Sequence, residues 1–251
     1  NGIKVYLFEA LRPTPELSFA IRHLGCKAGV VCTASHNPKE YNGYKAYFND
    51  GGQLVPPHDK NVIIEVEKIE KVEDVKWNGG ESNIHLLGEE MDKAYIGMVK
   101  GLSVYPDVIQ RQNDLKIVYT PIHGTGFIMV PQVLKEFGFT NVHVVEEQMV
   151  PDPNFSTVAS PNPENKEAFE YALRSGEKVN ADLLIATDPD ADRLGIAVLH
   201  DGDYHLLTGN QTGAIMLHYI LKTRKEQGTL PKKGMVYNTV VTSQFGAKIA
   251  E

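Results

Sequence analysis

Short strand-like runs alternate with amphipathic helical segments along most of this chain. The run "IKVYLF" at residues 3–8 is followed by apolar residues at helical spacing and then by a second apolar run at residues 28–32. We expect Thr14 to cap the intervening helix, with Pro15 in its first position, and Gly25 to end it. A strand, a helix and a strand in this order predict a parallel sheet that buries residues 28–32 and carries functional loops at the carboxyl ends of its strands.

The same alternation continues along the rest of the chain. We predict helices near residues 58–71, 89–100, 127–137 and 164–175, strands over residues 115–120, 141–147, 181–187 and 194–200, and a third unit with a strand at 234–241. A turn-rich segment, "SVYPDV", indicates a domain boundary near residue 105. The chain is therefore predicted to be an α/β protein of consecutive domains with mixed, mostly parallel sheets.

The charge balance limits the partners of such a protein. The chain has 32 acidic and 25 basic side chains and a formal charge of −7, without the clustered cations that nucleic acid or an anionic membrane surface requires. No apolar run approaches the roughly 20 residues that span a bilayer, and no basic-then-apolar leader opens the chain. Cys26 and Cys32 are the only cysteines, so we expect a reducing compartment, the cytoplasm. The oligomeric state stays open.

One candidate site follows the second apolar run. Ser35 lies just past residues 28–32, where a hydroxyl can face a cleft and free backbone N–H groups can meet an anion. A serine in such a place is most often part of a polar turn. Asn42 and Gly43, however, predict a type I′ hairpin that returns the chain beside this loop. The hairpin favours a functional serine over a plain turn.

The strand after this turn carries a lysine. Side chains alternate along a strand, so Lys45 is expected on the face opposite to an apolar one. That apolar face consists of Tyr44, Ala46 and Phe48. A lysine held beside a serine loop can act as a general acid or base or can bind an anion, although a solvated surface lysine is the commoner case.

A second candidate site follows a later buried strand. Asp188, Asp190 and Asp192 alternate along the chain, and like charges this close repel one another unless a cation sits among them. Asp-Pro loops are often only turns, but a hard divalent cation is the natural resident here. An EF-hand is excluded, because Arg193 and Leu199 stand where glycine and glutamate are needed. Three monodentate carboxylates leave positions open on an octahedral ion, which suits Mg²⁺ holding a phosphate oxygen.

Four motifs together carry a family resemblance. They are "TASHNP" at residues 33–38, "YNGYK" at 41–45, "PIHGTG" at 121–126 and "DPDADR" at 188–193. In this order they resemble the α-D-phosphohexomutase family, which includes phosphoglucomutases and phosphomannomutases. The similarity extends over essentially the whole chain and implies the phosphohexomutase type of fold.

The resemblance implies three domains. Residues 1–105 correspond to the phosphoserine domain without its beginning, residues 106–208 to the metal-binding domain, and residues 209–251 to the start of a sugar-binding domain. The family's sugar-selecting loop and its C-terminal phosphate-binding loop are expected to lie outside this chain. The preferred sugar therefore stays open, and the isolated chain is expected not to catalyse a complete isomerisation.

The resemblance also assigns the principal site residues. Ser35 is implied to be the phosphorylated serine. Asp188, Asp190 and Asp192 are implied to bind Mg²⁺ together with the phosphoserine.

Further residues of the motifs match active-site positions of the family. Lys45 is implied to be an acid or base that also contacts substrate, and Arg193 is implied to contact the phosphoryl group and the substrate. His36 lies within the serine motif and is a candidate catalytic residue. His123 and the glycines around it are interpreted as architecture, because a histidine in a tight loop is more often structural.

The implied reaction interconverts 1-phospho and 6-phospho sugars, glucose or mannose, through the phosphoserine and a sugar bisphosphate intermediate. Phosphopentomutases and sugar-bisphosphate synthases of the same family share these motifs and stay open as alternatives. A phosphatase with an aspartyl nucleophile would use Asp188 and Asp190, but its motif normally continues with a small residue where Asp192 stands. A metal-binding remnant without turnover is the non-enzymatic alternative.

Overall fold

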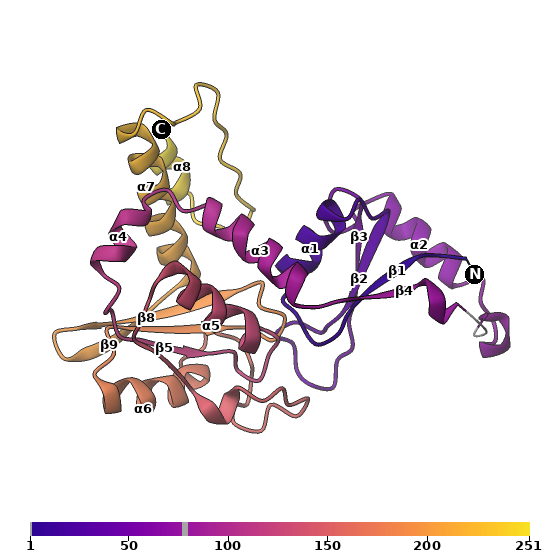
Figure 1. Ribbon diagram of the computed structural model, residues 1–251, viewed down its shortest axis with the longest axis horizontal. Coiled ribbons are helices and arrows are strands. Elements are labelled where there is room, and N and C mark those ends of the chain that lie inside the picture. Colours follow the sequence, from indigo (N-terminus) through magenta and orange to yellow (C-terminus); the bar gives the residue numbers. More distant parts are fainter. Residues whose placement is uncertain (1, 77–79) are drawn as a thin grey trace.

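The computed structural model of the chain describes residues 2–76 and 80–251 and shows an α/β fold with mixed sheets, as predicted (Figure 1). A serine-bearing part with two short sheets lies beside an aspartate-bearing part with one five-stranded sheet. A third part near the C-terminus consists of two helices and their connection. The domain boundaries predicted from the sequence stay predictions.

The serine-bearing part contains two pairs of strands. Its elements are β1 (Val5–Phe8), α1 (Thr14–His23), β2 (Ala28–Cys32), β3 (Tyr44–Phe48), α2 (His58–Val66) and β4 (Ile84–Leu87). Strand β1 pairs with β4 in parallel, and β2 pairs with β3 antiparallel. The parallel sheet predicted from the β1–α1–β2 order is therefore wrong in its pairing, because each of these strands takes its partner from later in the chain. Gly25 ends α1 in the left-handed conformation as predicted, whereas Pro13, not Thr14, occupies the N-cap position.

The two faces of the β2–β3 pair differ from the prediction. Strand β2 is not buried, since its residues alternate between exposed and half-buried and Val30 is 45% exposed. The apolar face of β3 is also open, with Tyr44 65% and Phe48 46% exposed. The opposite face is the covered one, because Tyr47 is buried there and Lys45 is half-buried. Lys45 thus points inward, towards the rest of the molecule.

Helix α3 (Glu89–Gly101) connects the two parts. It packs against α1 and against α5 (Gly126–Phe137) of the aspartate-bearing part. The segment predicted as a turn after it forms a short helix, α4 (Pro106–Arg111), because Pro106 supplies a preset φ at its first position.

The aspartate-bearing part is built on a five-stranded sheet in the order β6-β5-β7-β8-β9. The first three strands in this order are parallel, and the last two pairings are antiparallel. The strands are β5 (Ile117–Thr120), β6 (Val142–Val144), β7 (Leu183–Thr187), β8 (Leu194–His200) and β9 (Asp203–Leu207), and the helices are α5 (Gly126–Phe137) and α6 (Glu170–Val179). Helix α6 packs on β5 and β7, and their contact forms the core around Val118, Phe169 and Leu184.

The remaining elements complete the chain. Helix α2 ends earlier than predicted, and α6 starts later, because residues before it form a 3-10 turn. Helices α7 (Gly209–Glu226) and α8 (Phe245–Ala250) make up the third part, and the short 3-10 helices are Val72–Asp74, Glu81–Asn83, Glu146–Gln148 and Lys166–Phe169. The strand predicted at residues 234–241 is wrong, because residues 234–239 have no regular secondary structure and residues 240–241 lie in a turn, with Val240 and Val241 exposed. Among the described helices, none has both the length and the apolar character needed to cross a bilayer.

Candidate active site

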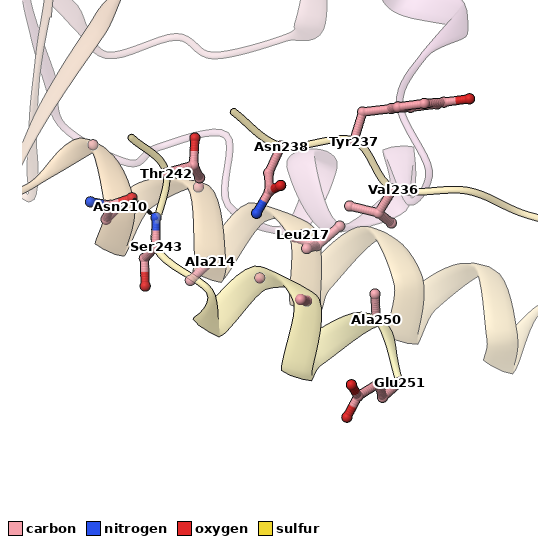
Figure 2. Close-up of a pocket in the computed structure, with 14 residues that line it drawn as sticks. Asn210, Ala214, Leu217, Val236, Tyr237, Asn238, Thr242, Ser243, Ala250 and Glu251 are labelled. Atoms are coloured by element: carbon pink, nitrogen blue, oxygen red, sulfur yellow. Dashed lines mark hydrogen bonds between the residues drawn. The ribbon is translucent and has the colours of Figure 1, made fainter. Parts of the chain in front are cut away.

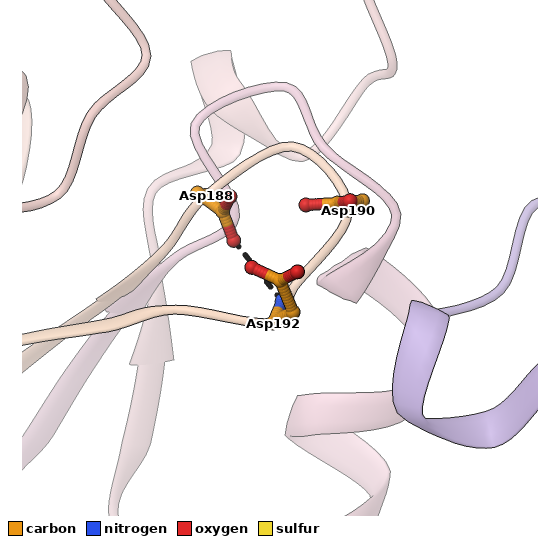
Figure 3. A group of neighbouring side chains, drawn as sticks. All are labelled: Asp188, Asp190 and Asp192. Carbon is orange, nitrogen blue, oxygen red and sulfur yellow. Dashed lines mark hydrogen bonds between the residues drawn. The ribbon is translucent and has the colours of Figure 1, made fainter. Parts of the chain in front are cut away.

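The loop between β7 and β8 brings three carboxylates together. Asp188 and Asp190 are buried and Asp192 is exposed, and one carboxylate oxygen of each lies within 4.8 Å of the others (Figure 3). The loop is closed by Asp188, whose Oδ1 accepts hydrogen bonds from the backbone N–H groups of Asp192 at 3.1 Å and Arg193 at 3.0 Å. Ala191 turns the chain with a φ of 54°. This arrangement fits a metal ion, because three converging oxygens are the donors that hard cations prefer.

The charges of this loop are unevenly distributed. Burial, reinforced by the charge of Asp190, raises the pKa of Asp188 to about 7. Burial would also raise the pKa of Asp190, but the hydrogen bond from Lys45 and further hydrogen bonds outweigh it and lower that pKa. Asp190 is therefore held ionised, whereas burial and the neighbouring charges keep Asp188 partly protonated near pH 7. A bound cation would favour the ionised form of both carboxylates.

Ser35 lies directly against this loop. Its Oγ is 3.1 Å from Oδ2 of Asp188 and 3.3 Å from Oδ1 of Asp190, although more than 150 residues separate them in the chain. The backbone N–H of Ser35 donates to Oγ1 of Thr33 at 2.8 Å. Ser35 has a φ of 56°, a conformation that is uncommon for residues other than glycine and that is often found at functional sites. The structure thus places the predicted serine and two of the predicted aspartates at one point.

The connection that carries Ser35 differs from the predicted hairpin. Neither Asn42 nor Gly43 is among the residues with a positive φ, so they do not form a type I′ turn. Instead, residues 33–43 form one long loop, with the N–H of Thr33 donating to the carbonyl of Gly43 at 3.0 Å. A Cβ at position 43 would lie 1.7 Å from the Thr33 carbonyl oxygen. Glycine is therefore required there for close backbone approach.

Lys45 spans two of the aspartates. Its Nζ donates to Oδ2 of Asp190 at 2.7 Å and to Oδ2 of Asp192 at 3.2 Å. Burial acts to lower the pKa of Lys45, but these hydrogen bonds and charges prevail and raise it. The side chain is consequently an ammonium group in this arrangement, which suits an anion contact or a proton donor.

His36 and Arg193 lie at the edge of the same cluster. Nδ1 of His36 is 3.2 Å from Oγ of Ser35, and burial, followed by the charge of Arg193, lowers the pKa of this histidine. The backbone of Arg193 belongs to the aspartate loop, but its side chain is exposed. The guanidinium is therefore available to an incoming ligand.

The loop that contains His123 packs against the aspartate loop. Gly124 packs on Pro189, and the N–H of Thr125 donates to the Pro189 carbonyl at 2.8 Å. The ring nitrogens of His123 lie 2.9 Å from the Val150 carbonyl and 2.8 Å from Oγ1 of Thr157. Both ring nitrogens of His123 are therefore engaged in contacts within the fold.

A cleft of about 840 Å³ opens over the cluster, with Ser35, Asp190, Arg12 and His123 among its lining residues. A second hollow, of about 560 Å³, lies between α7 and α8 (Figure 2). Its lining is mostly small or apolar and contains none of the predicted site residues. The first cleft is therefore the candidate substrate site.

Sequence reasoning missed the support that α1 gives to the site. The backbone N–H of Thr14, which was expected to act as a cap, donates instead to the carbonyl of Asp190 at 2.9 Å. Nearby, Arg12 forms a buried ion pair with Asp92 of α3. No motif marks these contacts, because a backbone donor has no residue signature and the ion pair joins distant segments.

The α/β fold thus brings together a serine hydroxyl, a lysine and three carboxylates that could hold a metal ion, with Ser35 and Asp190 lining one cleft. Comparisons with known proteins identify the family that has this fold. Residues 1–73 match the model of phosphoglucomutase/phosphomannomutase alpha/beta/alpha domain I, and residues 93–202 match the model of alpha/beta/alpha domain II. The chain belongs to the phosphoglucomutase/phosphomannomutase family.

Similar proteins of known sequence are phosphoglucomutases. The one from Staphylococcus haemolyticus (strain JCSC1435) is 40% identical over 260 residues, covering 100% of this chain and 45% of the relative. One from Staphylococcus epidermidis (strain ATCC 12228) is 38% identical over 255 residues, covering 99% of this chain and 45% of the relative. The chain thus spans about half the length of the curated relatives it matches.

Similar solved structures share the fold. A phosphomannomutase, described as putative, from Thermus thermophilus has a TM-score of 0.70 and 27% identity, over 89% of this chain and 47% of the other. An N-acetylphosphoglucosamine mutase from Aspergillus fumigatus, solved with glucose 1,6-bisphosphate, has a TM-score of 0.50 and 16% identity, over 86% of this chain and 52% of the other. The second likeness concerns the fold alone.

Proposed function

We propose that this chain carries the phosphoryl-transfer centre of a phosphohexomutase, which interconverts 1-phospho and 6-phospho sugars through a phosphoserine and a sugar bisphosphate. The observation that carries the proposal is the position of Ser35, whose Oγ lies 3.1 Å and 3.3 Å from oxygens of Asp188 and Asp190. A hydroxyl with no catalytic role has little need of two carboxylate neighbours, because it can donate only one hydrogen bond. A phosphorylated one would share a cation with them.

Mg²⁺ is the proposed ion, held by Asp188, Asp190 and Asp192. When bound, it supplies positive charge that stabilises the transferring phosphoryl group. The choice of Mg²⁺ rests on the donor set, since three oxygen ligands leave places for a phosphate oxygen and water. The ionised Asp190 and the crowded, buried Asp188 are the residues that would gain most from the added charge.

The other residues have distinct proposed roles. Lys45, held as an ammonium by Asp190, would protonate the sugar oxygen that leaves when a phosphoryl group passes from the substrate to Ser35, or would bind the phosphate of the substrate. Arg193 has its side chain free to meet the phosphate of the substrate. His36, with its Nδ1 3.2 Å from the Ser35 hydroxyl oxygen, would orient that oxygen. Phosphoryl transfer depends mainly on such positioning and charge neutralisation.

The proposed substrates are hexose phosphates, glucose or mannose, and the proposed compartment is the cytoplasm. The family and the named relatives support a sugar phosphate as the substrate class. Glucose 1,6-bisphosphate, present in the Aspergillus complex, is the natural probe. It resembles the proposed intermediate and can donate a phosphoryl group to Ser35.

The test is to incubate the chain with glucose 1,6-bisphosphate and Mg²⁺ and to locate the phosphate by intact-protein mass spectrometry and peptide mapping. The proposal expects one stable phosphoryl group on Ser35. Transient phosphate on Asp188 would instead support a phosphatase with an aspartyl nucleophile. No phosphate on any residue would support a metal-binding remnant and would overturn the proposal.

A further inference from the structure

The contact between α1 and α3 contains a buried acid that the proposed chemistry does not use. Glu16, in the first turn of α1, is completely buried, with 0% of its surface exposed. Among the residues that the structure describes, neither oxygen of its carboxyl group has a hydrogen-bond partner. An ionised carboxylate in such a place is strongly unfavourable, because it has lost its water without gaining a donor.

The neighbouring acid, Asp92, is already satisfied as an anion. Nε of Arg12 donates to Oδ1 of Asp92 at 2.8 Å, and Nη2 donates to Oδ2 at 2.8 Å. Both side chains are only 5% exposed, so this bidentate pair is a buried and electrically neutral unit. An ionised Glu16 beside it would leave one uncompensated negative charge in the interior.

Few other charged groups face this cluster. Glu9, on the same loop as Arg12, lies 4.0 Å from its Nη2, but the Glu9 side chain is half-exposed. Tyr95 faces the cluster from α3, and its pKa is raised by burial and then by the charge of Glu16. Burial, followed by the proximity of the Asp92 carboxylate, raises the pKa of Glu16 to about 8, while the charge of Arg12 opposes this rise.

We propose that Glu16 and Asp92 share one proton, while Arg12 holds Asp92 through two hydrogen bonds. This shared proton fixes α1 on α3. A protonated Glu16 can donate its O–H to the Asp92 carboxylate, which gives the unpartnered carboxyl group of Glu16 a hydrogen-bond partner. The assignment concerns the packing of the protein and does not depend on the phosphoryl-transfer chemistry.

This contact positions the two halves of the site. Helix α3 packs on both α1 and α5, so it ties the serine-bearing part to the aspartate-bearing part. The first residue of α1, Thr14, donates its N–H to the carbonyl of Asp190. Movement of α1 on α3 would therefore displace a residue that contacts the aspartate loop. Glu16, Asp92 and Arg12 are accordingly assigned as positioning residues.

The pH dependence of stability tests the shared proton. The pKa of Glu16 is raised from 4.5 to about 8 on folding, so the folded state binds the proton more tightly than the unfolded state. The contribution of Glu16 to the free energy of unfolding is fully present below about pH 4.5 and is lost as the pH rises from about 4.5 to about 8. The unfolding constant should increase by up to tenfold per pH unit in this window for the one proton released.

Comparison with variants isolates this contribution in urea unfolding of the full chain. Glu16→Gln keeps a donor for Asp92 but cannot ionise, so it should match the parent near pH 5 and exceed its stability near pH 8. Glu90→Gln, at an exposed position of α3, is the matched control. Its free energy of unfolding should change with pH as that of the parent does. The same change of unfolding free energy with pH in the parent and in Glu16→Gln would overturn the proposal.

A second variant distinguishes a proton shared with Asp92 from a proton held by burial of Glu16 alone. Asp92→Asn removes the proton-sharing partner and leaves the Arg12 guanidinium to pair with Glu16, which should then ionise readily. The pH-dependent loss of stability should therefore disappear in Asp92→Asn. Its persistence in this variant would show that burial alone holds the proton and would contradict the sharing.

Hydrogen exchange tests the positioning role. In the parent, the protection factor of the Thr14 amide should fall at least tenfold between pH 6 and pH 9, relative to the amide of Tyr119 in the five-stranded sheet. The fall should be absent in Glu16→Gln. An equal fall in both proteins would show that the cluster does not hold the start of α1 against the aspartate loop.

Discussion

The five-stranded sheet and the β2–β3 pair each supply one half of the candidate site, but from very different surroundings. All four residues of β5 are buried, and β7 leads directly into the fully buried Asp188. In β2, by contrast, alternate residues are exposed. The aspartate loop therefore rests on a packed core. The serine loop takes its position from contacts with the aspartate loop.

These contacts are specific and few. Ser35 reaches Asp188 and Asp190, and Lys45 reaches Asp190 and Asp192. This difference indicates that the aspartate half of the site is preorganised by its core, whereas the serine half is oriented by charged contacts. Disturbing the core of the aspartate-bearing part should thus disturb the whole site. Changes on the open face of the β2–β3 pair should have small effects.

The largest expected effect comes from a substitution in the serine half. Ser35→Ala should completely abolish phosphate transfer from glucose 1,6-bisphosphate, because it removes the only proposed covalent carrier. Since only one hydroxyl of a half-buried loop is lost, the urea midpoint should stay close to that of the parent. Intact-protein mass spectrometry and urea unfolding check both statements.

Ser175→Ala, on α6, is the control for that variant and should accept phosphate as the parent does. Phosphate uptake by Ser35→Ala within tenfold of the parent would exclude Ser35 as the carrier.

The contrast in burial predicts the next effect, on stability. Leu184→Ala in β7, at a position with 0% exposure, should lower the free energy of unfolding by about 2–5 kcal/mol. Val30→Ala in β2, at a position with 45% exposure, should change it by no more than about 0.5 kcal/mol. Urea denaturation of both variants measures the difference. Similar losses would break the comparison between the two regions.

A smaller effect is expected where the histidine loop supports the aspartate loop. A Cβ at Gly124 would lie 2.5 Å from Cα of Pro189, so Gly124→Ala should displace the aspartate loop and weaken Mg²⁺ binding by roughly tenfold, a change of about 1.4 kcal/mol. Isothermal titration calorimetry measures this affinity.

Gly97→Ala is the matched control, since a Cβ there meets nothing within 4 Å and α3 is a regular helix at this point. It should bind Mg²⁺ like the parent and be slightly more stable, because alanine favours a helix. Equal affinities for all three proteins would show that the loop around Gly124 does not position the carboxylates.

The sequence predicted which residues gather in the candidate site better than it predicted the surrounding sheets. The alternation of apolar runs located most strands of the aspartate-bearing part, because a buried strand leaves a continuous apolar run. It could not assign partners to β1 and β2, because pairing depends on strands far along the chain. The predicted apolar face of β3 is open because the inward face carries Lys45 and Tyr47 instead.

The candidate site residues were predicted from motifs and charge. Three aspartates at alternate positions indicated a cation site without any knowledge of the fold, and the structure brings Ser35 and Lys45 to them. The roles of these residues stay proposals. Glu16 could not be found in the same way, because a glutamate in the first turn of a helix is ordinary and only its burial makes it unusual.

The most direct test of a shared site is the Mg²⁺ affinity of the chain with and without a phosphoryl group on Ser35. If phosphoserine and the three aspartates hold one ion, phosphorylation should tighten Mg²⁺ binding by at least tenfold, because it adds a charged oxygen ligand. In Asp190→Asn, calorimetry should show weak binding in both states. Equal Mg²⁺ affinity of the phosphorylated and unphosphorylated parent would contradict the claim that Ser35 and the aspartates form one centre.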